Sequence, residues 1–400
     1  MNLRGKKILS IYYKHKPGGF CKRFYMMLKA LADAGGEVHY IAVEPYPISH
    51  PRIVPHILSV PFSKREGLLF WFYFILTVPF YSLLIGLRSK IDIVSVFGGL
   101  YSFLAFPLKL GRTPIITFAR SDVREINRLQ RRSPLLMFFE DILVGIGFKR
   151  SDRVITVSDF LRETLSTRYR IHSKKIGVLK NHITYAPTDA FTREACRRRL
   201  GLGSGDFIVM TLAVLNPEKN IEVLIRAGGT LKRPVTILIV GEGPERLKLE
   251  RIASQTTGPT SVIFTGWQDP ASDYLSAADL FVFPSKYEGC SNALLEALAH
   301  GVPCLGSRIP PNREILCSEG LLFDPDDPEG LAKKISRIST DGGYHEEVRI
   351  LSEQSAKPFL FDWDHAVVLL HQEVLGLSKD RADVGSPPSV EGTSVVPNSR

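Results

Sequence analysis

The first half of the chain alternates short, almost uninterrupted apolar runs with longer helix-forming stretches. The runs that predict β-strands cover residues 6–13, 37–43, 91–97, 113–119 and 152–158. A helix is predicted between the first two strands, from about Cys21 to Ala34. Strands that are apolar on both faces are typical of a parallel sheet with helices on each side.

The same pattern restarts near residue 205. Strand-forming runs follow at residues 207–215, 235–241, 262–266 and 280–285. The glycine-rich stretch GLGSG at 201–205 is the predicted linker. The expected fold class is α/β, with two Rossmann-like, doubly wound parallel-sheet domains at residues 1–190 and 200–360. We expect a C-terminal helix within 361–377 and a polar, disordered tail at 378–400.

Residues 67–87 form an uncharged segment of 21 residues between Arg65 and Arg88. This length suffices for a transmembrane helix. A single crossing, however, would place the strands before and after it on opposite sides of a membrane, and Pro79 is expected to interrupt the helix. The aromatic side chains beside basic flanks favour a helix in the membrane interface. A wholly buried helix and a true span are the alternatives.

Charge is divided unequally along the chain. Residues 1–200 hold 33 lysines and arginines against 14 aspartates and glutamates, whereas residues 201–400 hold 18 against 27. The basic half is expected to meet an anionic membrane surface or a lipid-phosphate acceptor. Nucleic acid is not favoured as a partner, because the arginines are not interleaved with aromatic residues in a known module. Dispersed basic residues that only aid solubility are the alternative.

The five cysteines include no C-x-x-C pair and no zinc-ligand spacing. They favour reduced thiols in a cytosolic protein. The first residues, MNLRGKKILS, lack the pattern of a signal peptide. Together with the apolar segment, this predicts a cytoplasmic protein that is peripheral on the inner face of the cell membrane.

The strongest chemical signal is the string KYEGCSNALLEALAHGVPCLGS at residues 286–307. It follows a strand and contains a helix expected at about 293–300, which Ser291 or Asn292 can cap. Glu296 is the one residue that interrupts the apolar surface of this helix. A carboxylate buried on every side needs a polar partner, and a ribose hydroxyl is suitable.

Glu288 lies eight residues earlier, in the loop before the helix, and Gly289 is expected to loosen that turn. In doubly wound folds, ligands bind at the carboxyl ends of the strands, so both carboxylates can face one crevice. The backbone N–H groups of residues 291–293 lie at the positive end of the helix dipole and predict a diphosphate site. The alternative is that Glu288 pairs with Lys286 or Arg308 on the surface.

As a whole, E-G-x-S-N-A-L-L-E-A-L-A-x-G-V-P resembles the signature of family 4 retaining glycosyltransferases, whose GT-B fold places two Rossmann-like domains across a cleft. The resemblance covers about 360 residues. It includes strings that occur in the order expected for that family: SDRVITVSDFLRETL (151–165), VLKNHI (178–183), LAVLNPEKNIEVLIRA (212–227), GEGPE (241–245), FTGW (264–267) and AADLFVFPS (277–285).

The resemblance implies roles for individual residues. Lys219 would contact the donor diphosphate, Glu296 the ribose, and Glu288 the transferred sugar beside its anomeric carbon. The glycine turn after Pro17 would let the first loop approach the phosphates closely. The expected catalytic residues are Glu288, Lys219 and Arg120. The residues expected to contact the donor are Gly18, Gly19, Lys219, Gly241, Glu288, Gly289, Ser291, Asn292, Ala293 and Glu296.

Some positions depart from the family pattern. Val214 stands where the family has an arginine beside the diphosphate, and Arg120 is a candidate to replace that cation. Arg120 or Asp122 stands where the family has a histidine near the sugar. Glu314 is expected to be a helix-start residue rather than a ligand. The string GEGP lacks a third glycine, so it does not favour nicotinamide binding.

The resemblance therefore implies a hexosyltransferase that uses a nucleoside-diphosphate sugar as donor, retains the anomeric configuration and needs no metal or cofactor. The acceptor would be a glycan or a polyprenyl-diphosphate-linked sugar, in the synthesis of a cell-surface polysaccharide or glycolipid. A nucleotide-sugar epimerase of similar fold and an inactive homologue that binds membranes or partners are the alternatives.

Overall fold

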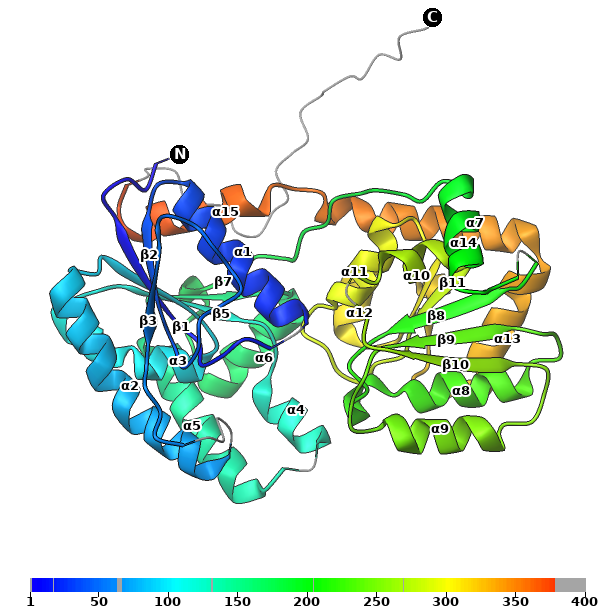
Figure 1. Cartoon of the computed structure of the whole chain (residues 1–400), viewed down its shortest axis with the longest axis horizontal. Coiled ribbons are helices and arrows are strands. Elements are labelled where there is room, and N and C mark those ends of the chain that lie inside the picture. Colours follow the sequence, from blue (N-terminus) through cyan, green and yellow to red (C-terminus); the bar gives the residue numbers. More distant parts are fainter. Residues whose placement is uncertain are drawn as a thin grey trace, which may run out of the picture.

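The computed structural model describes residues 2–16, 18–62, 67–130, 132–203, 205–268 and 270–377. Within these residues, the strands form two parallel sheets that are flanked by helices (Figure 1). The predicted α/β fold with two doubly wound domains is thus confirmed. The tail expected at 378–400 lies outside the described residues.

The N-terminal sheet has seven strands among the described residues, in the order β3-β2-β1-β4-β5-β6-β7. Strands β4 and β5 are buried along their whole length, as their continuous apolar runs predicted. The strands are β1 (Lys7–Ile11), β2 (Glu37–Ala42), β3 (Ile53–Ile57), β4 (Ile93–Phe97), β5 (Ile115–Ala119), β6 (Arg153–Thr156) and β7 (Ile176–Val178). The helices are α1 (Gly19–Asp33), α2 (Leu68–Ser89), α3 (Gly99–Leu104), α4 (Val123–Leu129), α5 (Pro134–Arg150) and α6 (Asp159–Tyr169).

The C-terminal sheet repeats this topology with six strands among the described residues, in the order β10-β9-β8-β11-β12-β13. Its strands are β8 (Ile208–Leu212), β9 (Thr236–Val240), β10 (Ser261–Gly266), β11 (Leu280–Phe283), β12 (Cys304–Ser307) and β13 (Leu322–Phe323). Its helices are α7 (Ala190–Arg199), α8 (Ile221–Thr230), α9 (Arg246–Gln255), α10 (Ser272–Ala277), α11 (Asn292–Ala299), α12 (Pro310–Ile315), α13 (Pro328–Thr340) and α14 (Gly342–Ala356).

Each sheet has one switch point, where the order of the strands reverses. It lies between β1 and β4 in the N-terminal sheet and between β8 and β11 in the C-terminal sheet. Loops diverge at such a point and leave a crevice beyond the carboxyl ends of the strands. The two switch points therefore determine where each domain can bind a ligand.

The last helix, α15 (Trp363–Val374), returns to the N-terminal domain and packs against α1. Val367 joins the N-terminal core, and His371 is fully buried beside it. Nδ1 of His371 lies 2.7 Å from the Val367 carbonyl oxygen, and its Nε2 lies 3.0 Å from the hydroxyl of Ser95. Burial lowers the pKa of His371 to about 4, so the ring is neutral in the folded protein at neutral pH.

Helix α2 differs from one expectation and from one of the alternatives. It continues through Pro79 without a break. It is also not wholly buried: Phe74 packs into the core, whereas Phe72 and Phe80 are 66% and 76% exposed. The helix is long and apolar enough to cross a membrane by length and composition. A crossing would, however, divide one sheet, because β3 precedes α2 and β4 follows it.

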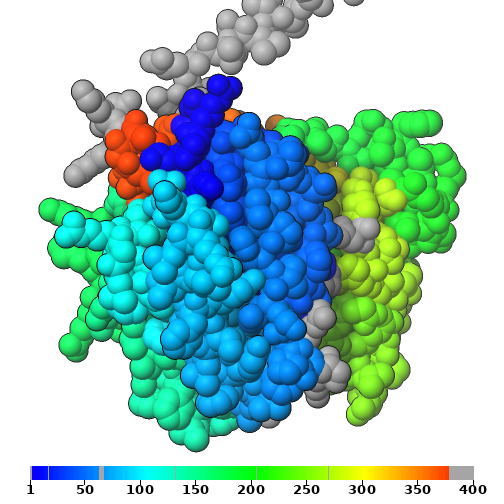
Figure 2. All heavy atoms as spheres, turned by 60° about the vertical axis from the view of Figure 1, so that its left-hand side comes forward, coloured from blue at the N-terminus to red at the C-terminus, as the bar shows by residue number. Residues whose placement is uncertain are grey.

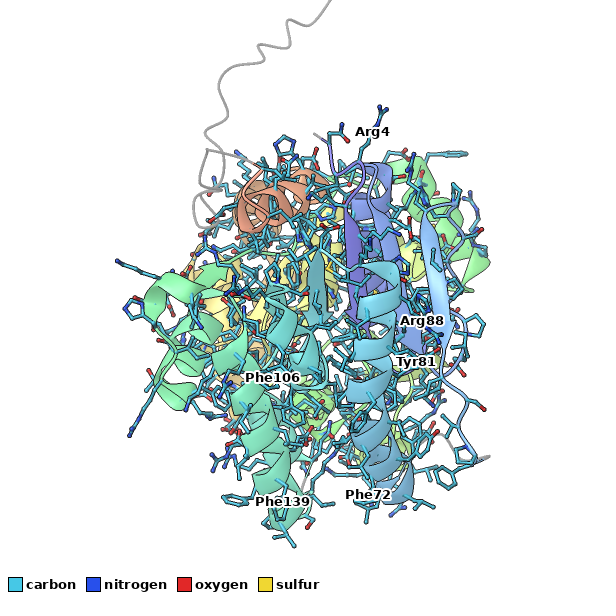
Figure 3. The ribbon with its side chains drawn as sticks, turned by 90° about the vertical axis from the view of Figure 1, so that its left-hand side faces the viewer. Arg4, Phe72, Tyr81, Arg88, Phe106 and Phe139 are labelled. Atoms are coloured by element: carbon cyan, nitrogen blue, oxygen red, sulfur yellow. The ribbon has the colours of Figure 1, made fainter. Side chains whose placement is uncertain are left out.

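Helix α5 carries a second exposed apolar face. Phe138 and Phe139 are 61% and 56% exposed near its start, and Ile142 and Ile146 continue the exposed stripe. The labelled Phe72 and Phe139 lie at the same end of α2 and α5, on the face that is turned away from the C-terminal domain (Figure 3). The N-terminal domain thus presents two apolar helix surfaces on one side.

Candidate functional site

A cleft of about 790 Å³ lies between the two domains, which meet along a seam that runs down the molecule (Figure 2). Both domains contribute loops that follow the carboxyl ends of parallel strands. Of the predicted site residues, all but one line this cleft: Gly18, Gly19, Arg120, Lys219, Gly241, Glu288, Ser291, Asn292, Ala293 and Glu296. The exception is Gly289.

Lys219 and Glu288 form an ion pair at one wall of the cleft. Lys219 ends a short turn after β8, and Glu288 lies in the loop after β11. The Nζ atom of Lys219 is 2.5 Å from Oε1 of Glu288, and both side chains are mostly buried. The pair therefore holds an ammonium and a carboxylate in fixed positions beside the switch point of the C-terminal sheet.

Helix α11 begins at the same wall. Ser291 caps it, since its hydroxyl accepts a hydrogen bond from the Leu294 N–H at 3.1 Å. The amides of a first helical turn have no partner within the helix and lie at the positive end of its dipole. Asn292 and Ala293, in that first turn, line the cleft. The start of α11 is therefore suited to an anion such as a diphosphate.

Glu296 faces the cleft rather than the protein interior. Its side chain is 37% exposed, whereas its neighbours Leu295 and Ala297 are buried. The expectation that this carboxylate is buried on every side is therefore wrong. Its partner is Lys22, in the first turn of α1, whose Nζ lies 3.2 Å from Oε1 of Glu296. Sequence reasoning missed Lys22.

The glycine loop of the N-terminal domain meets the start of α11. Gly18 has a φ of 121°, a conformation that L side chains rarely adopt, and Gly19 begins α1. A Cβ atom on Gly19 would lie 2.2 Å from the side-chain nitrogen of Asn292. A larger residue at this position would therefore displace the side chain of Asn292. Pro17, named with these glycines, lies outside the described residues.

Arg120 follows β5 and faces the cleft from the N-terminal domain. Its Nη1 donates to Oδ1 of Asn181 at 2.9 Å, and the Nδ2 of Asn181 donates to Oδ1 of Asn292 at 2.8 Å. Burial, reinforced by the nearby guanidinium of Arg23, lowers the pKa of Arg120 to about 10. The side chain thus stays cationic at neutral pH and is linked through an amide to the start of α11.

Asp122 and Glu314 have structural contacts instead. Asp122 pairs with Arg168 and caps α4, and it does not line the cleft. Glu314 accepts hydrogen bonds from the backbone N–H groups of Asp159 and Phe160, at 2.9 and 2.5 Å. It therefore caps α6 of the other domain rather than starting its own helix, and it joins the two domains.

Four further positions shape the cleft or its surroundings. Gly289 packs against the N-terminal domain: a Cβ atom there would lie 1.9 Å from the carbonyl oxygen of Arg120. Gly289 is thus required by a close approach between domains, not by a loose turn. Gly241 and Val214 line the cleft beyond β9 and β8, and Val214 is 39% exposed. His15, which sequence reasoning also missed, lines it from the loop after β1.

Among the described residues, no group of three or more His, Cys, Asp or Glu side chains is arranged to hold a metal ion. The prediction that the reaction needs no metal stays a prediction. The charged groups at the cleft are cations from both domains and carboxylates from the C-terminal domain. Such an arrangement can bind a polyanion and hydrogen-bond the hydroxyl groups attached to it.

Two family models match the chain. The one described as Glycosyltransferase Family 4 matches residues 17–185, and the one described as Glycosyl transferases group 1 matches residues 192–357. The boundary between the two matches falls near the passage from the N-terminal to the C-terminal sheet.

Two curated relatives show the range of the similarity. The chain is 32% identical over 257 residues to the serotype-specific mannosyltransferase WbdA of Escherichia coli, a match that covers 61% of this chain and 31% of that protein. It is 32% identical over 136 residues to the lipopolysaccharide core biosynthesis glycosyltransferase LpsE of Rhizobium meliloti, covering 34% of this chain and 40% of that protein. The chain thus spans less than half of the length of each.

The fold recurs in solved structures. HepE of Anabaena, in complex with UDP and glucose, superposes with a TM-score of 0.70 at 17% identity, and the match covers 93% of this chain and 98% of that chain. This likeness extends over both domains.

Proposed function

Because the chain belongs to glycosyltransferase family 4, we propose that it moves a hexose or an N-acetylhexosamine from a nucleoside-diphosphate sugar to a glycan or lipid-linked acceptor. The transfer retains the anomeric configuration and serves the synthesis of a cell-surface polysaccharide or glycolipid. One observation carries the proposal: Lys219, Glu288 and Glu296 share one cleft with the start of α11.

The chemistry requires a diphosphate to leave a sugar that develops positive charge. The bond between the anomeric carbon and the diphosphate oxygen breaks, and the acceptor oxygen bonds to the same carbon on the same face. The proton of the acceptor hydroxyl passes to the departing phosphate oxygen. Preorganised donors lower this barrier most effectively where negative charge develops. Lys219 and the first-turn amides of α11 are those donors.

The two carboxylates take different parts. Glu288 is held beside Lys219, where it orients the ammonium, accepts hydrogen bonds from sugar hydroxyls and stabilises positive charge near the anomeric carbon. Glu296 lies one helical turn further along α11, where it accepts hydrogen bonds from the ribose hydroxyls. A donor that spans both carboxylates would place its diphosphate at the start of the helix.

Val214 stands where the family has an arginine, so the second cation for the diphosphate comes from the N-terminal domain. Lys22 stands at the start of α1, within 3.2 Å of Glu296, and Arg120 faces the same cleft. We assign Lys22 to the donor side, because it contacts the carboxylate proposed to hold the ribose. Arg120 is better placed for the transferred sugar or the acceptor, since it is fixed to Asn181 beside Asn292.

The exposed apolar faces of α2 and α5 support a lipid-linked acceptor. They lie on one side of the basic N-terminal domain, as an interfacial protein requires. The similarity to a lipopolysaccharide core biosynthesis glycosyltransferase agrees with this class of acceptor. The protein would work at the cytoplasmic face of the membrane, where nucleotide sugars are available.

The test is incubation with a panel of UDP and GDP sugars, with and without a lipid extract, followed by mass spectrometry of the products. We expect a glycosylated lipid or glycan that forms only when acceptor and donor are both present. Glu288→Gln should abolish it, whereas Lys286→Met, a neighbouring charge change outside the cleft, should not. Conversion of the donor alone into an isomeric nucleotide sugar would instead identify an epimerase.

A further inference from the structure

A second cavity, of about 850 Å³, lies between α4 and α5 in the N-terminal domain. It shares no lining residue with the interdomain cleft. One wall is apolar and belongs to α5, with Met137, Phe138, Ile142 and Ile146. The cavity therefore opens along the same helix face that carries the exposed apolar stripe.

The opposite wall is basic. Arg124 and Arg128 lie four residues apart on α4, Arg132 follows the end of that helix, and Lys149 adds a cation from the end of α5. The spacing places Arg124 and Arg128 on one side of the helix, and Arg132 lines the same cavity. Asp141 is the carboxylate among the lining residues, so four cations face the cavity against one anion.

These cations differ in how far they are neutralised. Arg124 pairs with Asp141 at 3.3 Å, and Arg128 pairs with Glu125 at 2.6 Å. Within the part of the chain that the structure describes, the ion pairs include neither Arg132 nor Lys149. The cavity thus joins an apolar wall to an arginine row (Arg124, Arg128 and Arg132), in which Arg132, together with Lys149, has spare capacity for an anion.

Helix α4 connects this cavity to the catalytic cleft. Just before its start, the N–H of Asp122 donates to the hydroxyl of Tyr287 at 2.7 Å, and Tyr287 precedes Glu288. Just after its end, the side chain of Gln130 lies 3.4 Å from Glu218, which precedes Lys219. A ligand on the arginine row would therefore lie one short helix away from the proposed reaction centre.

We propose that this cavity binds the lipid-diphosphate end of a polyprenyl-diphosphate-linked acceptor. The arginine row holds the diphosphate, the wall of α5 covers the first isoprene units, and the attached sugar reaches toward the cleft along α4. The proposal rests on the proposed glycosyltransferase function and locates its acceptor. The link to Glu288 and Lys219 favours an acceptor over a bulk phospholipid, which needs no route to the cleft.

The test is calorimetric titration of the full chain in detergent with geranylgeranyl diphosphate, which carries both parts of the proposed ligand. Geranylgeraniol and inorganic pyrophosphate each carry one part and should bind at least tenfold more weakly. Arg128→Gln/Arg132→Gln should weaken binding of geranylgeranyl diphosphate at least tenfold. Arg198→Gln/Arg226→Gln removes two exposed charges of the C-terminal domain and should leave binding within twofold.

Several results would overturn the proposal. Equal affinity of the cavity variant and the wild type would show that the arginine row is not the site. If Arg128→Gln/Arg132→Gln weakens binding to geranylgeranyl diphosphate and binding to phosphatidylglycerol nanodiscs by the same factor, the arginine row makes a general membrane contact. Ile146→Ser, which changes the apolar wall alone, should weaken geranylgeranyl diphosphate binding and leave pyrophosphate binding unchanged. If it weakens neither, the apolar wall takes no part.

Titration of the same preparations with nucleotide sugars separates this proposal from the proposed function. If nucleotide sugars bind and geranylgeranyl diphosphate does not, the acceptor site is wrong and the donor site stands. If neither class binds, the glycosyltransferase function itself fails.

Discussion

The ammonium of Lys219 lies 2.5 Å from the carboxylate of Glu288, although 69 positions separate the two residues in the chain. Their loops follow β8 and β11, the neighbouring strands at the switch point of the C-terminal sheet. Because both side chains are mostly buried, each fixes the orientation of the other. In the proposed reaction, Lys219 stabilises the negative charge on the departing diphosphate, and Glu288 stabilises the positive charge on the sugar.

Replacing either partner should slow the chemical step. We expect Lys219→Met and Glu288→Gln each to lower kcat by about 10²–10³-fold, the usual effect of losing one preorganised electrostatic group. The double variant should lose less than the product of the two effects, because the residues act as a unit. Steady-state kinetics on the four proteins measures this. Full additivity would contradict the coupling, and Lys286→Met should stay near wild-type activity.

The ammonium of Lys22 should replace the arginine that the family has at the position of Val214. Lys22→Met is expected to raise KM for the donor about tenfold, the size of one lost charge-assisted hydrogen bond. Val214→Arg in the same background should recover part of this loss by restoring a cation on the other wall. Lys29→Met, an exposed change on the same helix, is the control. An unchanged donor KM in Lys22→Met would rule out this role.

Membrane binding should depend on the tips of α2 and α5. Wild-type protein is expected to float with phosphatidylglycerol vesicles more strongly than with phosphatidylcholine vesicles. Phe72→Glu/Phe139→Glu should lower the bound fraction at least tenfold, since burying a phenylalanine contributes about 1.5–3 kcal/mol. Phe191→Glu changes a residue of the C-terminal domain that is 80% exposed and should not lower the bound fraction. Equal flotation of both variants would place the contact elsewhere.

His371 should make the fold sensitive to acid. Its pKa is about 4 in the folded protein, against about 6.5 in an unfolded chain. As the pH falls from 6.5 to 4, the unfolded state takes up the proton first, so the free energy of unfolding decreases, by up to about 3 kcal/mol. His371→Gln should flatten this part of the stability curve. Calorimetric melting between pH 4 and 8 tests this, with the exposed His365→Gln as control; identical slopes would contradict it.

The sequence predicted most of the strands that are buried on both faces, because the longer ones are continuous apolar runs. It missed the edge strand β3, which contains Pro55 and is only partly buried. It also missed β7, β12 and β13, which have three, four and two residues. Short strands contain too few residues for a periodic signal, and neighbouring strands decide whether they form.

The site residues were predicted from one string and one resemblance. Neither of these predicts contacts between distant segments of the chain. Lys22 and Glu296 are 274 positions apart, and Glu314 caps a helix that starts 155 positions earlier. The same holds for Gly289, where a side chain is excluded by the carbonyl group of Arg120 in the other domain. Only the packing of the two domains brings these groups together.

Isothermal titration of the wild type and Lys219→Met with UDP, GDP and their hexose derivatives tests the central claim most directly. We expect the wild type to bind one nucleotide sugar per chain and Lys219→Met to bind it at least tenfold more weakly. Lys232→Met, an exposed change outside the cleft, should bind like the wild type. If the wild type binds none of these compounds, or Lys219→Met binds them equally well, the cleft is not a nucleotide-sugar site.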